Sequence, residues 1–149
     1  MESYVTEVEL LARTRHATQT DKAGRPYSEH LEAVADNVRI NGGSDAQVAA
    51  AWLHDAVEDG ALSEIELDAL AVPEETKRIV LAVTKHPRES DEDYAQRILN
   101  EPGARLVKAA DIAHNSDPSR LAKLDDPVKK RLALKYTNMR LLLGIEVPE

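Results

Sequence analysis

Apolar residues recur every three or four positions along most of the chain, and no long run alternates between apolar and polar positions. This spacing is typical of amphipathic α-helices, and clusters of Gly, Pro and Ser separate the segments at short intervals. The pattern therefore predicts an all-α fold. Helices are predicted over about residues 2–17, 28–41, 44–60, a short stretch from 63, 73–84, 90–99, 102–114 and 127–144.

The predicted helix ends depend on capping residues. Ser44 with Gln47 and Ser63 with Glu66 have the spacing of a capping box, in which each side chain satisfies the other's free backbone N–H group. Caps or first-turn residues are also expected at Ser28, Pro73, Ser90, Pro102 and Pro127, and stops at Gly60 and Gly144.

Length and composition indicate one compact domain over residues 1–149. Only 3% of the residues are aromatic and none is Phe, so the core must consist of Ala, Leu, Val and Ile. A net charge of −8 without a basic run argues against a nucleic-acid polymer as partner. No apolar stretch approaches the ~20 residues of a membrane helix, and the chain start lacks the pattern of a signal peptide, so we expect a cytoplasmic protein.

The segment AWLHDAVEDG, residues 51–60, concentrates polar groups at the end of a predicted helix. At about 100° per residue, the apolar side chains of residues 49–59 fall on one side of this helix. The opposite side then carries His54, Asp55, Glu58 and Asp59. A helix with one buried and one solvated face would look the same. However, carboxylates are disfavoured near a helix C-terminus, and no Lys or Arg lies within the segment to offset them.

A bound cation would make these carboxylates favourable at the end of the helix, because it attracts both the carboxylates and the negative end of the helix dipole. The chain contains no Cys, so a metal would have to be held by His, Asp, Glu or backbone oxygen. His54 and Asp55 offer one nitrogen and one oxygen ligand, and Glu58 and Asp59 are then close enough to orient or deprotonate a water molecule on the metal.

Two further segments supply candidate ligands. Asp111 lies among apolar residues in LVKAADIAH, where a buried carboxylate needs a cation or a strong donor; an exposed stripe shared with Lys108 and Asn115 is the alternative. His30 lies near the start of a predicted helix, a position where a lone His is often structural. Together with His54 and Asp55, these residues form a mixed nitrogen and oxygen set suited to Mn²⁺, Fe²⁺ or Zn²⁺.

These residues resemble the HD phosphohydrolase superfamily, whose pattern is a His, a His-Asp pair and a distant Asp. Three blocks resemble the hydrolase domain of RelA/SpoT proteins and the small alarmone hydrolases: HATQTDKAGRPYSEH (16–30), AAAWLHDAVEDG (49–60) and RLVKAADIAHN (105–115). The middle block is the most specific, because in that branch the His-Asp pair is followed by Glu-Asp.

The resemblance implies a compact helical bundle of the HD type and a set of roles. The metal ligands would be His30, His54, Asp55 and Asp111, and the catalytic acids Glu58 and Asp59. Asn115 would contact the nucleotide sugar. Apart from the resemblance, the basic residues Lys22, Arg25 and Lys108 could clamp a polyphosphate, with a solvated side chain as the alternative for each. The family uses Mn²⁺ to remove the 3′-pyrophosphate of guanosine tetra- and pentaphosphate, so we expect a Mn²⁺-dependent hydrolase acting on a small phosphorylated nucleotide.

The sequence departs from the family pattern at the positions that contact the nucleotide base, so it does not show whether the base of the substrate is guanine or adenine. The position where the family has an Arg that stacks on the base is Asp21, and Ser116-Asp117-Pro118 replaces the usual Met-Arg-Thr. Guanosine and adenosine alarmones are both candidate substrates. The alternatives are another nucleotide phosphohydrolase of the superfamily, such as a nucleotidase, and a non-catalytic nucleotide-binding partner.

Overall fold

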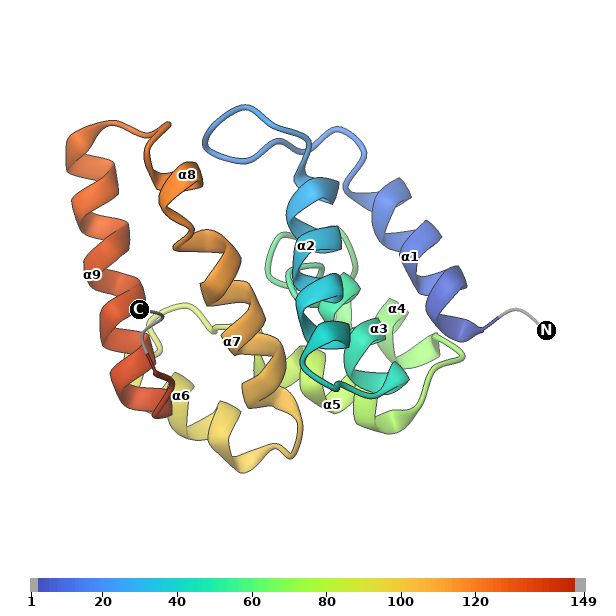
Figure 1. Ribbon diagram of the computed structural model, residues 1–149. Coiled ribbons are helices and arrows are strands. Elements are labelled where there is room, and N and C mark those ends of the chain that lie inside the picture. Colours follow the sequence, from blue (N-terminus) through green and yellow to red (C-terminus); the bar gives the residue numbers. More distant parts are fainter. Residues whose placement is uncertain (1–2, 147–149) are drawn as a thin grey trace.

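The computed structural model describes residues 3–146, which form nine helices and no β-strand (Figure 1). The all-α prediction is confirmed. The helices are α1 (Tyr4–Arg15), α2 (Tyr27–Ile40), α3 (Asp45–Leu53), α4 (Glu64–Ala69), α5 (Glu74–Ala82), α6 (Asp91–Asn100), α7 (Ala104–Asn115), α8 (Pro118–Leu121) and α9 (Asp126–Leu143).

α3 is the centre of the core. Every residue from Ala46 to Leu53 except Gln47 is buried, and the helix packs against α1, α2, α5 and α7. Four of these buried residues are alanines, which allow neighbouring helices to approach closely. The rest of the core comes mainly from Val, Leu and Ile, as the Phe-free composition requires. The positions that carry the metal-site candidates are therefore joined to the buried centre of the molecule.

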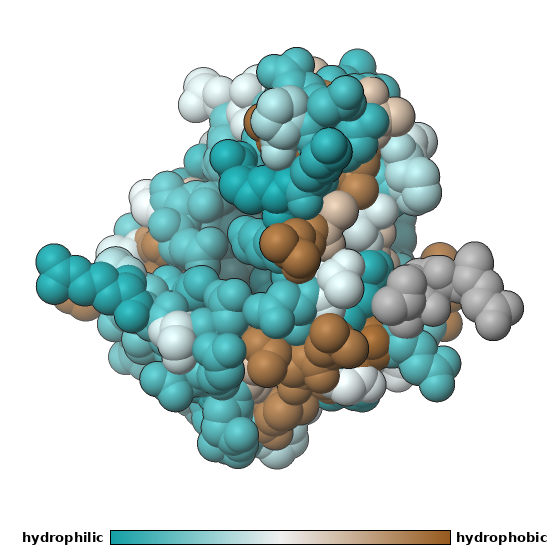
Figure 2. Space-filling model, turned by 90° about the vertical axis from the view of Figure 1, so that its left-hand side faces the viewer, coloured by the Kyte–Doolittle hydropathy of each residue, from teal (hydrophilic) through white to brown (hydrophobic). Residues whose placement is uncertain are grey.

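α9 forms one side of the molecule, where it packs on α6 and α7 (Figure 1). Its buried face carries Leu132, Met139 and Leu143, while Leu134 and Leu141 are exposed. Figure 2 shows this side: its surface is mostly hydrophilic, with hydrophobic residues gathered in the lower half of the view. Among residues 3–146, none of the helices combines the length and the apolar character needed to cross a bilayer.

Several predicted helix ends are confirmed. Both capping boxes are present, the Ser90 side chain accepts from the N–H of Asp93, and Gly144 ends α9 with a left-handed φ of 67°. The expected cap at Ser28 is wrong: α2 begins one residue earlier, after Pro26, and has no side-chain cap. α7 begins after Gly103 rather than at Pro102, because Gly103 adopts the left-handed conformation, with a φ of 87°.

The third predicted helix does not continue to Gly60. α3 ends at Leu53, and residues 54–60 form successive turns. In a continued helix, the carbonyl of Ala51 would accept from the backbone N–H of Asp55. Instead this carbonyl lies 2.6 Å from Nδ1 of His54, whose backbone N–H also points to it at 3.4 Å. The His54 side chain thus competes with the backbone for the acceptor and helps to end the helix.

Candidate metal centre and adjacent cleft

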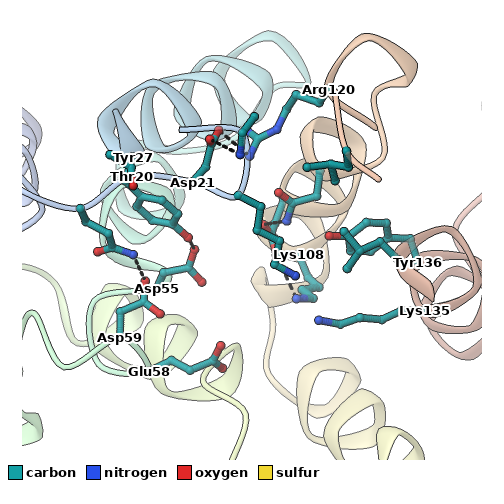
Figure 3. Close-up of a pocket in the computed structure, with 17 residues that line it drawn as sticks. Thr20, Asp21, Tyr27, Asp55, Glu58, Asp59, Lys108, Arg120, Lys135 and Tyr136 are labelled. Carbon is teal, nitrogen blue, oxygen red and sulfur yellow. Dashed lines mark hydrogen bonds and ion pairs between the residues drawn. The ribbon is translucent and has the colours of Figure 1, made fainter. Parts of the chain in front are cut away.

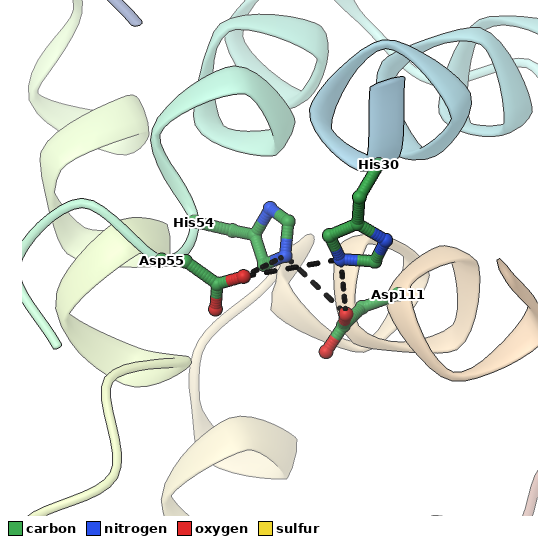
Figure 4. Close-up of side chains that lie close together, drawn as sticks. All are labelled: His30, His54, Asp55 and Asp111. Carbon is green, nitrogen blue, oxygen red and sulfur yellow. Dashed lines mark hydrogen bonds and ion pairs between the residues drawn. The ribbon is translucent and has the colours of Figure 1, made fainter. Parts of the chain in front are cut away.

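The four predicted metal ligands meet although they come from three separate segments. His30 lies on α2, His54 and Asp55 directly after α3, and Asp111 on α7 (Figure 4). One ligand atom from each residue lies within 4.8 Å of all the others. Nε2 of His30 is 3.0 Å from Oδ1 of Asp111, and Nε2 of His54 is 3.0 Å from Oδ2 of Asp55. The residues can hold one metal ion between them.

The chemistry of these atoms fits a shared cation. Nε2 of His54 is buried and has no hydrogen-bond partner of acceptable geometry, although carboxylate oxygens lie 3.0 and 3.3 Å away. Its Nδ1 donates to the Ala51 carbonyl, so a neutral His54 directs the lone pair of Nε2 at the carboxylates. A nitrogen lone pair and two carboxylates converging on one point repel each other unless a proton or a cation lies between them.

The electrostatics of the cluster lead to the same conclusion. Burial would lower the pKa of His54, but Asp55 and Asp111 raise it well above the usual value. Burial would raise the pKa of Asp111, but Lys108 and His54 hold it well below the usual range. The two carboxylates therefore stay ionised and attract positive charge, which a divalent ion can supply in place of the His54 proton.

Glu58 and Asp59 lie next to this cluster, on the turns that follow α3. Oε1 of Glu58 accepts from the backbone N–H of Lys85 at 2.7 Å, and Oδ2 of Asp59 accepts from Nε2 of Gln19 at 2.9 Å. Each carboxylate is thus fixed through one oxygen. Burial raises the pKa of Glu58 and of Asp59, and the neighbouring Asp55 raises both further.

A cleft of about 360 Å³ opens over these residues. Figure 3 shows Asp55, Glu58 and Asp59 on one side of it, with Lys108, Lys135 and Tyr136 opposite. The separation of charge suits a ligand whose anionic groups face the lysines while its reacting bond faces the carboxylates and the metal ligands.

The predicted substrate contacts divide into three groups. Lys22 lines the cleft and is exposed. Lys108 and Asn115 also line it, but both already bond to Asp111, at 2.9 Å each. Arg25 is absent from the residues that line the cleft and forms an exposed ion pair with Glu29 at 2.6 Å. The structure thus does not bring Arg25 to the predicted site.

Two comparisons with known proteins bear on this site. The family model described as HD domain matches residues 9–142. The chain belongs to the HD-domain family. It is 37% identical to a protein of Synechocystis sp. named as a probable guanosine-3′,5′-bis(diphosphate) 3′-pyrophosphohydrolase, over 67% of this chain and 14% of that protein. It is also 30% identical to a probable GTP pyrophosphokinase of Mycobacterium leprae, over 80% of this chain and 16% of that protein. Aligned segments thus span about a seventh of these relatives.

The family assignment confirms the resemblance inferred from the three sequence blocks. In this HD domain, His16 supports Asp59 indirectly, because its Nδ1 lies 2.6 Å from Oε1 of Gln19, the residue that donates to Asp59. His86 is exposed. His114 contacts His30, with the two Nδ1 atoms 2.7 Å apart.

The cleft residues of this HD domain that were not predicted include Tyr27, Arg120, Lys135 and Tyr136. The Tyr27 hydroxyl donates to Oδ2 of Asp55. Lys135 is exposed, and desolvation together with the charges of Lys108 and Lys22 lowers its pKa. Arg120 lies on α8, a helix that was missed although Asp117 caps it and Pro118 occupies its first turn. That Asp-Pro pair was the available signal.

Proposed function

We propose that this HD domain is a divalent-metal-dependent hydrolase that removes the 3′-pyrophosphate of a guanosine or adenosine alarmone. The observation that carries the proposal is the convergence of His30, His54, Asp55 and Asp111, two of which, Asp55 and Asp111, line a cleft whose walls carry opposite charges. The name of the Synechocystis relative supplies the substrate class. We take residues 1–149 as one domain and Mn²⁺ as the metal; a cytoplasmic location stays a prediction.

The proposed chemistry divides between the ion and the protein. A bound divalent ion supplies Lewis acidity, which lowers the pKa of water and screens phosphate charge. His30, His54, Asp55 and Asp111 would hold it. Glu58 and Asp59 each have one oxygen fixed by a donor, so the other oxygen is available to orient the attacking water and accept its proton.

The opposite wall positions the phosphates. Lys22 and Lys135 line the cleft without an ion pair to a carboxylate within 4 Å among the described residues, so both are available for an anionic ligand. Lys135 lies close enough to Lys108 and Lys22 for their charges to lower its pKa. A polyphosphate would relieve this repulsion by placing negative charge among the three ammonium groups.

A substrate panel tests the proposal. Purified protein with Mn²⁺ is incubated with guanosine and adenosine 3′,5′-bis(diphosphates), the corresponding pentaphosphates and ordinary nucleotides, and pyrophosphate and phosphate are measured separately. We expect pyrophosphate from one or more of the alarmones. Phosphate from ordinary nucleotides would instead favour a nucleotidase, the second candidate, which the replacement of the stacking Arg by Asp21 motivates. If no compound of the panel releases pyrophosphate or phosphate, the remaining alternative is a non-catalytic nucleotide-binding protein.

A further inference from the structure

The two histidines of the metal centre are oriented by different partners. His54 uses a backbone carbonyl, that of Ala51, which lies 2.6 Å from its Nδ1. His30 uses another side chain: its Nδ1 is 2.7 Å from Nδ1 of His114, and the two rings stack with centroids 5.0 Å apart. Either ring nitrogen can donate in such a contact, so a third group must decide which one carries the proton.

Arg120 decides the direction of this hydrogen bond. Its NH1 group lies over the ring of His114, 2.7 Å from Nδ1 and 3.5 Å from Nε2, and is 3.4 Å from Nδ1 of His30. The guanidinium carries only N–H donors, and its positive charge lies closer to Nδ1 than to Nε2 of His114, so the neutral ring favours the tautomer with its proton on Nε2 and its Nδ1 lone pair free for His30. Nδ1 of His114 therefore accepts, and Nδ1 of His30 donates. Because a neutral imidazole carries one proton, Nε2 of His30 is then left with a lone pair directed at Asp111 and the metal position.

Arg120 is itself held in place from the other side of the cleft. Its NH2 group lies 3.1 Å from Oδ2 of Asp21, and the two side chains are only 23% and 9% exposed. Oδ1 of Asp21 accepts from the backbone N–H groups of Ala23 and Arg25, which fixes the carboxylate within its loop. Figure 3 shows Asp21 and Arg120 facing each other at the edge of the cleft.

We propose that Arg120, anchored by Asp21, is a positioning residue that fixes His114 as the acceptor for His30 and so sets Nε2 of His30 as a metal ligand. The inference rests on the metal dependence in the proposed function. It also assigns a role to Asp21: this acid holds the arginine that sets the metal ligand. Mutation of a residue that hydrogen-bonds to the second ring nitrogen of a metal-bound histidine typically lowers metal affinity about 10–100-fold.

The test measures metal affinity without a nucleotide. Metal-stripped protein of residues 1–149 is titrated with Mn²⁺ by calorimetry, comparing the unmodified protein with His114→Ala, His114→Gln, Arg120→Leu and Arg120→Lys. Arg39→Leu, which removes an exposed arginine of α2, is the matched control. We expect His114→Ala to weaken binding about 10–100-fold and Arg120→Leu about 10-fold. His114→Gln and Arg120→Lys, which retain an acceptor and a donor, should recover part of the loss, and Arg39→Leu should change nothing.

A second measurement detects the proton itself. In ¹⁵N-labelled protein loaded with Zn²⁺, which is diamagnetic, we expect an imidazole N–H resonance from Nδ1 of His30 that exchanges slowly with solvent. It should disappear in His114→Ala and shift in Arg120→Leu. A change in packing alone would not move the proton between nitrogens.

The outcomes separate this inference from the proposed function. If the unmodified protein binds Mn²⁺ and the His114 and Arg120 variants bind it equally well, the positioning role is wrong. If the unmodified protein does not bind the metal, both proposals fall. If the variants lose affinity as expected while no alarmone is hydrolysed, the positioning role stands and only the substrate assignment fails.

Discussion

Nε2 of His30 and Oδ1 of Asp111 lie 3.0 Å apart although 81 positions separate the two residues along the chain. The contact joins α2 to α7, and both helices pack on α3, which ends at the remaining two ligands. The metal centre is therefore built where the central helix ends, and its geometry depends on how these three helices pack.

Lys108 is expected to act as the counter-ion of Asp111 in the metal-free protein. Its Nζ lies 2.9 Å from Oδ2 of Asp111. Lys108→Met leaves a buried carboxylate without its cation, which costs about 3–5 kcal/mol when no other charge compensates. We expect a clear loss of unfolding free energy in urea without metal and a smaller loss with saturating Mn²⁺. Lys22→Met, which removes an exposed lysine of the same cleft, should leave stability unchanged. An equal loss for Lys108→Met in both conditions would contradict this role.

Glu58 and Asp59 should affect turnover without affecting metal retention. Glu58→Gln keeps the size of the side chain but cannot accept a proton, so we expect kcat to fall by about 10²–10⁴-fold while Mn²⁺ content stays unchanged. Asp59→Asn should also lower kcat. Asp55→Ala, by contrast, should lose both the metal and the activity. Metal analysis of each variant after gel filtration makes the distinction, and normal turnover by Glu58→Gln would exclude it as the base.

The pH dependence follows from the environment of Glu58. Burial and the charges of Asp55 and Asp59 raise its pKa above the usual value for Glu. A proton acceptor works only when ionised, so activity should fall on acidification at a higher pH than for an exposed carboxylate. Asp59→Asn removes one of the charges that raise this pKa, so the residual activity should persist to lower pH.

The control for the pH profile is the metal concentration. If protonation of the metal ligands caused the acid limb, raising Mn²⁺ would move the limb to lower pH. A limb that stays in place as Mn²⁺ increases but moves in Asp59→Asn assigns the limb to Glu58. The reverse result would contradict the assignment.

Lys22 and Arg25 should differ in their effect on substrate binding. Lys22 lines the cleft, whereas Arg25 is paired with Glu29 outside it. We expect Lys22→Met to raise KM several-fold and Arg25→Met to leave KM within about twofold, because exposed ion pairs contribute little. Steady-state kinetics on the best substrate of the panel measure both. Equal effects would mean that the loop rearranges when the nucleotide binds.

The sequence was most informative where polar residues stood in apolar surroundings. Asp111 was recognised because a carboxylate among apolar residues needs a partner, and His54 and Asp55 because carboxylates near a helix C-terminus are disfavoured without a cation; the structure brings these three residues together with His30. Capping residues likewise predicted several helix starts correctly, since a cap depends on local hydrogen bonds alone.

The rest of the site depends on contacts that no local pattern shows. Arg120 and Lys135 have the same surroundings in sequence as ordinary surface residues, and only the packing of α8 and α9 places them at the cleft. The end of α3 was misplaced because a single side-chain contact, from His54 to the carbonyl of Ala51, outweighs the helical periodicity that continues to Gly60.

The central claim is that His30, His54, Asp55 and Asp111 share one divalent ion. The most direct measurement is a crystal of the protein grown with Mn²⁺ and recorded at a wavelength where manganese scatters anomalously. The account predicts a single strong peak within coordination distance of Nε2 of His30, Nε2 of His54 and one carboxylate oxygen of each aspartate. Absence of a peak at this position in crystals saturated with Mn²⁺, or a peak held by other residues, would contradict it.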